Sequence, residues 1–151
     1  MSSTMSSKYS ADKCIDGDIV GREVDGNMCH SHHNLYPWLA IDYGTAVTVD
    51  RVEIYNRRSA CCGNRTKNVD VRISNKLPDS AHSMFSGGSL LGHFAGPAKK
   101  GQHILIKHPG QNVPFLLIVY SLSIFQENPC LVDMSLSRWT MVKTSLSTSE
   151  K

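Results

Sequence analysis

The sequence predicts an all-β domain, a sandwich or jelly roll of short strands. Five short segments alternate between apolar and polar residues, which is typical of strands with one face in a core. Turn-forming Gly, Pro and Asn residues separate them, and no window of helical length has a helical period. The chain has 151 residues, of which 40% are hydrophobic and 19% charged, so one domain with one core is expected.

The alternating segments define the expected strands. In chain order they are residues 38–43, 47–55, 69–73, 103–107 and 115–124. Gly44 is expected to end the first strand. The second strand contains a slip at Asp50 and Arg51, which is interpreted as a tight turn or a bulge. The last strand begins with an apolar run and is expected to be buried on both faces there.

The remaining segments are expected to be irregular. Residues 1–13 are polar and rich in Ser, and predict a loose N-terminal segment. Residues 76–101 contain several Gly and Pro and predict mostly loop. Residues 126–151 are rich in Ser, Thr and Lys without a pattern, and predict a poorly ordered C-terminal tail. The jelly roll is therefore assigned to residues 5–125.

Several classes of function are disfavoured by composition and motifs. The net charge of +3 is too small to indicate a nucleic-acid partner by itself. No apolar stretch approaches the roughly 20 residues of a membrane span, and the first residues lack the apolar core of a secretory signal. Without a phosphate loop, a G-x-S-x-G or an H-E-x-x-H motif, no enzyme is expected. The enzyme alternative is a zinc hydrolase that uses His32, His33 and a cysteine.

The segment that follows residues 52–55 carries the most informative chemistry. Arg58 and Arg65 flank the adjacent pair Cys61 and Cys62. Two guanidinium forks can bracket a ligand with neighbouring hydroxyls, since each donates to oxygen lone pairs. A disulfide between adjacent cysteines would be strained, because their Cα atoms lie only about 3.8 Å apart. Such a bond would form a flat patch suited to the C–H face of a sugar, and the alternative is two reduced cysteines in a loop.

Two further clusters are candidate sites. His30 and His32 lie in a short His-rich stretch, and a neutral imidazole can both donate to and accept from a sugar hydroxyl. The alternatives there are a metal site and a plain solvated loop. Asp16 and Asp18 surround Gly17, and such oxygen-rich turns can hold calcium. A plain Asp-Gly turn is the alternative.

Together these clusters resemble the F-type lectin family. Its signature is a histidine followed at a distance by R-x-D-C-C-x-x-R/K, and residues 58–65 (RSACCGNR) match both arginines and both cysteines. The framework is also similar over about residues 5–120. The matching stretches are 14–18 (CIDGD), 29–31 (CHS), 37–44 (PWLAIDYG), 52–57 (VEIYNR) and 101–110 (GQHILIKHPG).

The resemblance implies a jelly roll of the discoidin and F-type lectin kind that binds terminal L-fucose without catalysis. It implies that one histidine, Arg58 and Arg65 hydrogen-bond the sugar, and that a Cys61–Cys62 disulfide packs against the ring. It also implies one structural calcium near the site, for which Asp16 and Asp18 are the candidates. Fucosylated glycans or glycoproteins are the implied partners. Secretion, a role in innate immunity or cell recognition, and a homo-oligomer that adds avidity are further expectations.

The chain departs from the family pattern at three places. Ala60 stands where the motif has Asp, so Arg58 and Arg65 lack a local counter-ion, and weaker fucose binding or a shift toward anionic sugars is expected. The motif histidine falls between two candidates, of which His32 is preferred and His30 is second. The usual partner of Cys29 is missing, and either Cys14 or Cys130 could replace it. The alternative function is a degenerate adhesion module with weak or lost sugar binding that acts in protein–protein recognition.

Overall fold

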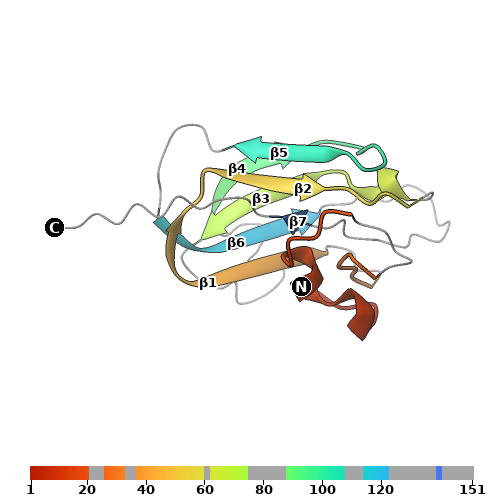
Figure 1. Cartoon of the computed structure of the whole chain (residues 1–151). Helices are drawn as coiled ribbons and strands as arrows, with labels where there is room; N and C mark the ends of the chain where they lie inside the picture. Colours follow the sequence, from red (N-terminus) through yellow and green to blue (C-terminus); the bar gives the residue numbers. More distant parts are fainter. Residues whose placement is uncertain are drawn as a thin grey trace.

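The chain folds as two antiparallel β-sheets that face each other (Figure 1). The computed structural model describes residues 1–20, 26–32, 37–59, 62–74, 88–107, 114–122 and 139–140. The strands are β1 (Trp38–Thr48), β2 (Arg51–Tyr55), β3 (Val69–Ser74), β4 (Ser89–Phe94), β5 (His103–Lys107), β6 (Pro114–Leu122) and β7 (Trp139–Thr140). The four-stranded sheet has the order β1-β6-β3-β4, and the three-stranded sheet has the order β5-β2-β7. The predicted all-β jelly-roll class is confirmed.

The core lies between the two sheets. In β3, Val69 and Val71 are 0% exposed, and the intervening Asp70 points to the outer face. In β2 of the other sheet, Val52 and Ile54 are also 0% exposed. The alternation that predicted these strands therefore reflects burial of one face, which supplies most of the folding free energy of such a sandwich.

The connection from β1 to β2 moves the chain from one sheet to the other. Gly44 does not end the first strand, so that prediction is wrong. Instead the pairing with β6 shifts register between Asp42 and Val47, and Gly44 adopts a positive φ of 66° with its N–H bonded to Asp42 Oδ1 at 2.8 Å. A glycine allows this irregularity without ending the strand. The slip predicted at Asp50 and Arg51 is the turn between the sheets, because β1 ends at Thr48 and β2 begins at Arg51.

Strand β4 lies in a region that was expected to be mostly loop. Its Leu90 is 50% exposed, its Leu91 is buried, and Gly92 interrupts the apolar pattern. The glycine is explained by the opposite sheet, since a Cβ on Gly92 would lie 2.6 Å from Ile106 Cγ2 of β5. The strand was missed because its pattern depends on this contact between sheets.

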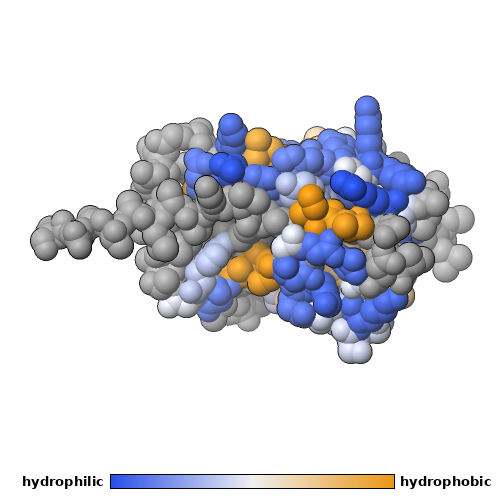
Figure 2. All heavy atoms as spheres, viewed as in Figure 1, coloured by the Kyte–Doolittle hydropathy of each residue, from blue (hydrophilic) through white to orange (hydrophobic). Residues whose placement is uncertain are grey.

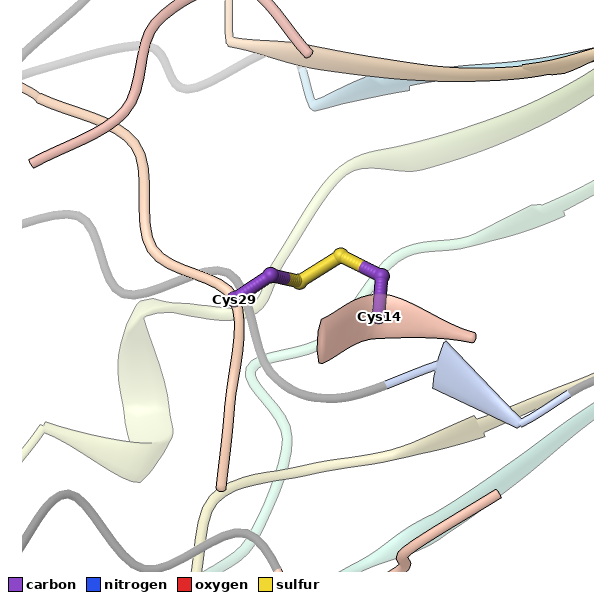
Figure 3. The surroundings of a disulfide bond; sticks show 2 residues. All are labelled: Cys14 and Cys29. Atoms are coloured by element: carbon purple, nitrogen blue, oxygen red, sulfur yellow. A yellow bond between two sulfur atoms is a disulfide. The ribbon is translucent and has the colours of Figure 1, made fainter. Parts of the chain in front are cut away.

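The N-terminal segment is attached to the domain, which differs from the expected loose segment. It contains the 3-10 turns η1 (Ser7–Tyr9) and η2 (Ala11–Cys14). Three backbone hydrogen bonds join this segment to residues 30 and 38. The N–H of Ser2 donates to Trp38 O at 2.8 Å, the N–H of Met5 donates to His30 O at 2.9 Å, and the N–H of His30 donates to Tyr9 O at 3.1 Å. A disulfide joins Cys14 to Cys29, and both are 0% exposed (Figure 3). This settles the partner of Cys29, which the sequence left open.

The predicted C-terminal tail contributes a short strand. Within residues 126–151 the structure describes Trp139 and Thr140, which form β7 and pair with Ile54 and Glu53 of β2. No helix in the described part of the chain is long and apolar enough to cross a membrane.

Candidate functional site

The loop that leaves β2 begins with two arginines in opposite environments. Arg57 is 0% exposed, and its carbonyl accepts a hydrogen bond of 2.8 Å from the N–H of Gly101. Arg58 is exposed, and its aliphatic stem lies over Gly101, where a Cβ would come within 3.1 Å of Arg58 Cγ. Gly101 has a positive φ of 64°. The glycine thus makes room for the stem of Arg58.

The other arm of the loop is the 3-10 turn η4 (Gly63–Arg65). Cys62 precedes it in the left-handed conformation, with φ 74° and ψ 6°, which is costly for a residue with a side chain. The N–H of Arg65 donates to the Cys62 carbonyl at 3.2 Å, and the Arg65 side chain is half-buried. Cys62 is disulfide-bonded, with its partner outside the described residues. Ala60 and Cys61 also lie outside them, so a bond between Cys61 and Cys62 stays a prediction.

A buried amide joins the two arms. Asn56 is 2% exposed, and its Nδ2 donates to Gly63 O at 2.7 Å and to Lys99 O at 2.8 Å. Its Oδ1 accepts from Thr66 Oγ1 at 2.9 Å. Asn56 therefore fixes both ends of the loop to the segment around Lys99. Sequence reasoning missed this residue, and the available signal was an asparagine at a strand end beside two arginines.

The arms of the loop also pack against the 98–102 turn directly. A Cβ on Gly63 would lie 3.2 Å from Lys100 Cα, so the two backbones are in close contact. In Figure 1, η4 lies beyond the end of β2, toward the same end of the sandwich as η1 and η2. Arg58 and Arg65 thus extend from backbone that is fixed at one end of the sandwich, on a rigid support typical of binding loops.

The two candidate histidines differ in burial. His30 is 1% exposed, its Nδ1 lies 2.6 Å from Ser31 O, and its ring contacts that of Tyr9 at 5.8 Å between centroids. His32 is exposed, and its N–H donates to Ser3 Oγ at 2.9 Å. Only an exposed imidazole can contact a ligand without rearrangement, so this placement favours a structural role for His30 and leaves His32 as the candidate contact. His33 lies outside the described residues.

Comparison with known families agrees with this architecture. A family model described as a NedA-like, galactose-binding domain matches residues 13–87. Residues 13–87, about half of the chain, are therefore similar to galactose-binding-like domains of the F5/F8 type C kind. The match includes Cys14 and Cys29, the loop with Arg58 and Arg65, and strands β1 to β3.

Individual proteins similar to this chain include two lectins of known structure. The pentraxin fusion protein of Xenopus laevis is 32% identical over 74 residues, which is 49% of this chain and 18% of that protein, so the chain spans less than a fifth of this relative. A fucolectin from the serum of striped bass (Morone saxatilis) has a TM-score of 0.69 at 18% identity, covering 91% of this chain and 41% of that one. The lectin domain of lectinolysin, complexed with Lewis b antigen, has a TM-score of 0.63 at 18% identity, covering 90% and 81%. The two solved structures share the fold expected from the F-type lectin resemblance.

The acidic turn at Asp16 and Asp18, the candidate calcium site, is held by its own hydrogen bonds. Asp16 Oδ1 accepts the N–H of Asp18 at 3.1 Å, and Asp18 Oδ1 accepts the N–H of Val20 at 2.9 Å. Lys13 Nζ lies 4.0 Å from Asp16 Oδ2. Across the described ranges, no three His, Cys, Asp or Glu side chains gather as a metal site would need. The two carboxylates stabilise their own turn, and a structural calcium at Asp16 and Asp18 stays a prediction.

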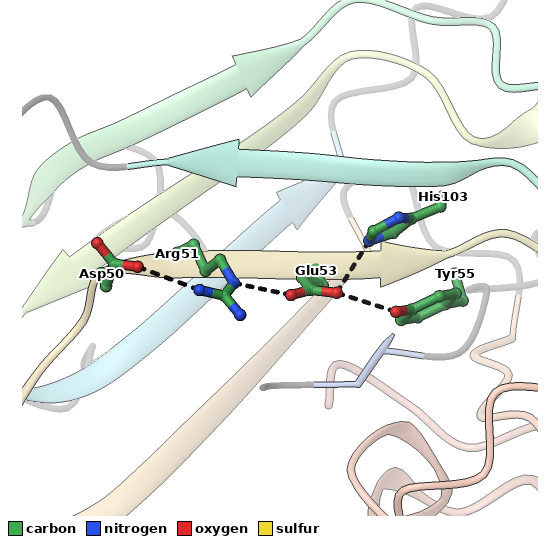
Figure 4. Close-up of polar contacts among 5 residues, drawn as sticks. All are labelled: Asp50, Arg51, Glu53, Tyr55 and His103. Atoms are coloured by element: carbon green, nitrogen blue, oxygen red, sulfur yellow. Dashed lines mark hydrogen bonds and ion pairs between the residues drawn. The ribbon is translucent and has the colours of Figure 1, made fainter. Parts of the chain in front are cut away.

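A second polar cluster lies on the outer face of β2 and β5 (Figure 4). Glu53 accepts from Arg51 Nε at 2.8 Å and from Tyr55 OH at 2.9 Å, and its Oε2 lies 3.0 Å from His103 Nε2. The rings of Tyr55 and His103 stack at 4.5 Å between centroids. The hydrogen bond from Arg51 is the main reason that the pKa of Glu53 lies below its usual value, and Tyr55 and His103 add to it against the opposing effect of burial. This cluster stabilises the sheet face.

Proposed function

We propose that this domain binds carbohydrate without catalysis, through the loop of residues 57–65, and that terminal fucose-like sugars are its ligands. The observation that carries the proposal is the geometry of this loop. Asn56 hydrogen-bonds to the backbone of Gly63 and Lys99, and Arg58 and Arg65 lie on the two arms of the loop. The solved structures of the same fold include a fucolectin and a lectin domain with a bound Lewis b antigen. They support a sugar ligand for this chain, although one fold can serve several functions.

The chemistry of the loop suits a sugar hydroxyl pair. A guanidinium only donates hydrogen bonds, so two of them complement the lone pairs of neighbouring hydroxyl oxygens. The disulfide at Cys62 adds a weakly polar surface for the C–H face of the ring. Because the backbone that carries Arg58 and Arg65 is held by Asn56 and by the 98–102 turn, little ordering entropy of these two segments opposes binding. Few hydrogen bonds form per site, so the affinity would be low and a homo-oligomer would raise it by avidity.

The proposed setting is extracellular. The Cys14–Cys29 disulfide is buried in the core, and Cys62 forms another disulfide. Disulfides persist mainly in oxidising compartments, where fucosylated glycoproteins are also found. Fucosylated glycans on cell or secreted surfaces are therefore the proposed partners, in a cell-recognition role.

The test is the loss of sugar binding when one arginine is removed. Arg65→Ala should lower the affinity for a fucoside, measured by calorimetry or by retention on a fucose column, by at least about tenfold, since hydrogen bonds from charged donors are lost. Lys107→Ala is the control, because Lys107 is exposed at the end of β5 remote from the loop. If Arg65→Ala remains folded by circular dichroism and is retained as strongly as the wild type, the site is not at this loop.

A second candidate is the adhesion module that has lost sugar binding, which Ala60 in place of the motif carboxylate favours. That candidate expects neither the wild type nor Arg65→Ala to bind any glycan. Figure 2 shows a face that is largely hydrophilic, with small separate apolar patches. The exposed large apolar residues in the described part of the chain are Met5, Ile15, Ile19, Leu90 and Leu105. Such a surface suits a polar ligand better than an apolar protein contact.

A further inference from the structure

We propose that Asn64 is the attachment site of an N-linked glycan, and that this glycan limits the access of ligands to the loop of residues 57–65. The attachment site stands on its own, whereas the effect on ligands rests on the proposed function. Residues 64–66 (NRT) form the sequence N-x-T, in which an asparagine accepts an oligosaccharide when the chain is secreted. No other Asn in the sequence is followed two residues later by Ser or Thr.

The fold presents Asn64 to solvent between buried neighbours. Asn64 lies in the middle of η4 and is exposed, whereas Gly63 and Thr66 are buried. Gly63 packs on the backbone of the 98–102 turn, since a Cβ there would lie 3.2 Å from Lys100 Cα. A glycan on Asn64 therefore extends away from the packed side of the turn and displaces no core atoms.

The disulfides support the compartment that this modification requires. Cys14 and Cys29 are bonded and buried, and Cys62 forms a further disulfide two residues before Asn64. Disulfides form and persist mainly in oxidising compartments, and asparagine-linked glycosylation acts on secreted chains. The disulfides and the acceptor sequence are thus two independent indications of the same secretory route.

The glycan is attached before this turn folds. The hydroxyl of Thr66, the third residue of the acceptor sequence, donates to Asn56 Oδ1 at 2.9 Å in the folded domain. Thr66 is buried there, so a transferase reaches it only on the unfolded chain. In the transfer, Asn64 Nδ2 loses a proton and forms a bond to C1 of the first sugar. The bond from that C1 to the pyrophosphate of a lipid-linked oligosaccharide breaks, and the lipid pyrophosphate leaves.

A glycan at Asn64 shares the surface of the proposed sugar site. Asn64 directly precedes Arg65, so their Cα atoms lie about 3.8 Å apart. A branched oligosaccharide is much larger than an arginine side chain, and it occupies space that a ligand of Arg65 needs. The unmodified loop therefore binds free glycans, and the modified loop binds them more weakly.

The first measurement is the occupancy of Asn64. The full 151-residue chain, secreted from cultured animal cells behind a secretory leader, should carry a glycan that peptide N-glycosidase removes. Tandem mass spectrometry should then find Asn64 converted to Asp. Asn64→Gln should lose the glycan, and Thr66→Ser should keep it, because serine preserves both the acceptor sequence and the hydroxyl that contacts Asn56. An unmodified Asn64 in secreted protein that is folded by circular dichroism would overturn the inference.

The second measurement is sugar binding by the same proteins, using biolayer interferometry on a fucoside surface. The glycosylated wild type should bind at least about tenfold more weakly than Asn64→Gln, as expected when the hydrogen bonds of one arginine are lost. The glycosylated Thr66→Ser variant should bind as weakly as the wild type. Equal affinities of the wild type and Asn64→Gln would overturn the shielding of the loop and leave the proposed function intact. Binding by none of the three proteins would overturn the proposed function, while a glycan found at Asn64 would still confirm the attachment site.

Discussion

The buried side chain of Asn56 holds the backbone of the loop in place, although the groups proposed to bind the ligand are on Arg58 and Arg65. Its amide nitrogen serves two carbonyls, at Gly63 and Lys99, and its amide oxygen serves the hydroxyl of Thr66. These partners come from two separate stretches of the chain, residues 63–66 and the segment around Lys99. A hydrophobic residue of similar size could fill the space but would remove the partner of the buried Gly63 carbonyl, of the part-buried Lys99 carbonyl and of the buried Thr66 hydroxyl.

Replacing Asn56 should therefore destabilise the domain and loosen the loop. Asn56→Ala should lower the free energy of unfolding by about 2–3 kcal/mol, measured by urea denaturation, because two buried hydrogen bonds and one part-buried hydrogen bond are lost. Asn64→Ala on η4 is the control, since Asn64 is exposed, and should change stability by no more than about 0.5 kcal/mol. Equal stability of the two variants would show that the amide contacts do not hold the loop.

At the scale of the element, β2 divides its residues between two tasks. Val52 and Ile54 point into the core, and Arg51, Glu53 and Tyr55 form the polar cluster on the outer face. The strand then continues directly into the binding loop. Because successive side chains of a strand point to opposite faces, β2 packs one face on the core and presents the other to the polar cluster.

The polar cluster on β2 predicts a pH dependence of stability. The folded-state pKa of Glu53 lies below its unfolded value, chiefly through Arg51, so the stabilisation is complete above the unfolded pKa of about 4.3 and is lost as the pH falls through the folded value. Glu53→Gln should cost about 1 kcal/mol at pH 7 in urea denaturation, and the difference from the wild type should shrink below about pH 4. Asp50→Asn, an exposed contact of the same arginine, should change stability little at either pH. A cost of Glu53→Gln that stayed constant down to pH 3 would contradict this assignment.

For the whole molecule, the N-terminal segment (residues 1–14) holds the start of β1 and residues 26–32 in place, and it is called the N-terminal brace below. Backbone bonds tie Ser2 to Trp38 and Met5 to His30, and the Cys14–Cys29 disulfide closes the segment against the core. The brace also positions residues 26–32, which contain the exposed His32. The disulfide closes a loop with a sequence separation of 15 residues. This restricts the conformations of the unfolded chain and so stabilises the folded state.

Removing the Cys14–Cys29 disulfide should therefore lower the stability of the whole domain against unfolding. Cys14→Ala with Cys29→Ala should reduce the free energy of unfolding by about 3 kcal/mol, as expected for a sequence separation of 15 residues. The single variant Cys29→Ala should be about as unstable as the double variant, because either change removes the same bond. An unchanged midpoint of chemical unfolding in the double variant would mean that the brace does not contribute to global stability.

Much of this architecture was readable in the sequence. Strands β3 and β5 were predicted almost to the residue, since each alternates cleanly and each buries one face. The residue types of the loop, two guanidiniums around two cysteines, were equally plain. Local pattern determines such features because they depend on residues next to one another in the chain.

Only the tertiary structure decided how these parts meet. It extended β1 past Gly44 through a register shift, explained Gly92 of β4 by the approach of Ile106, and paired Cys29 with Cys14. It also buried His30 and exposed His32, and it brought Lys99 and Lys100 beside a loop more than 30 residues earlier. The physical reason is that each of these features is set by atoms distant in sequence, whose approach depends on the packing of the two sheets. The sequence thus determined the chemistry that the loop carries, and the packing determined which charges surround it.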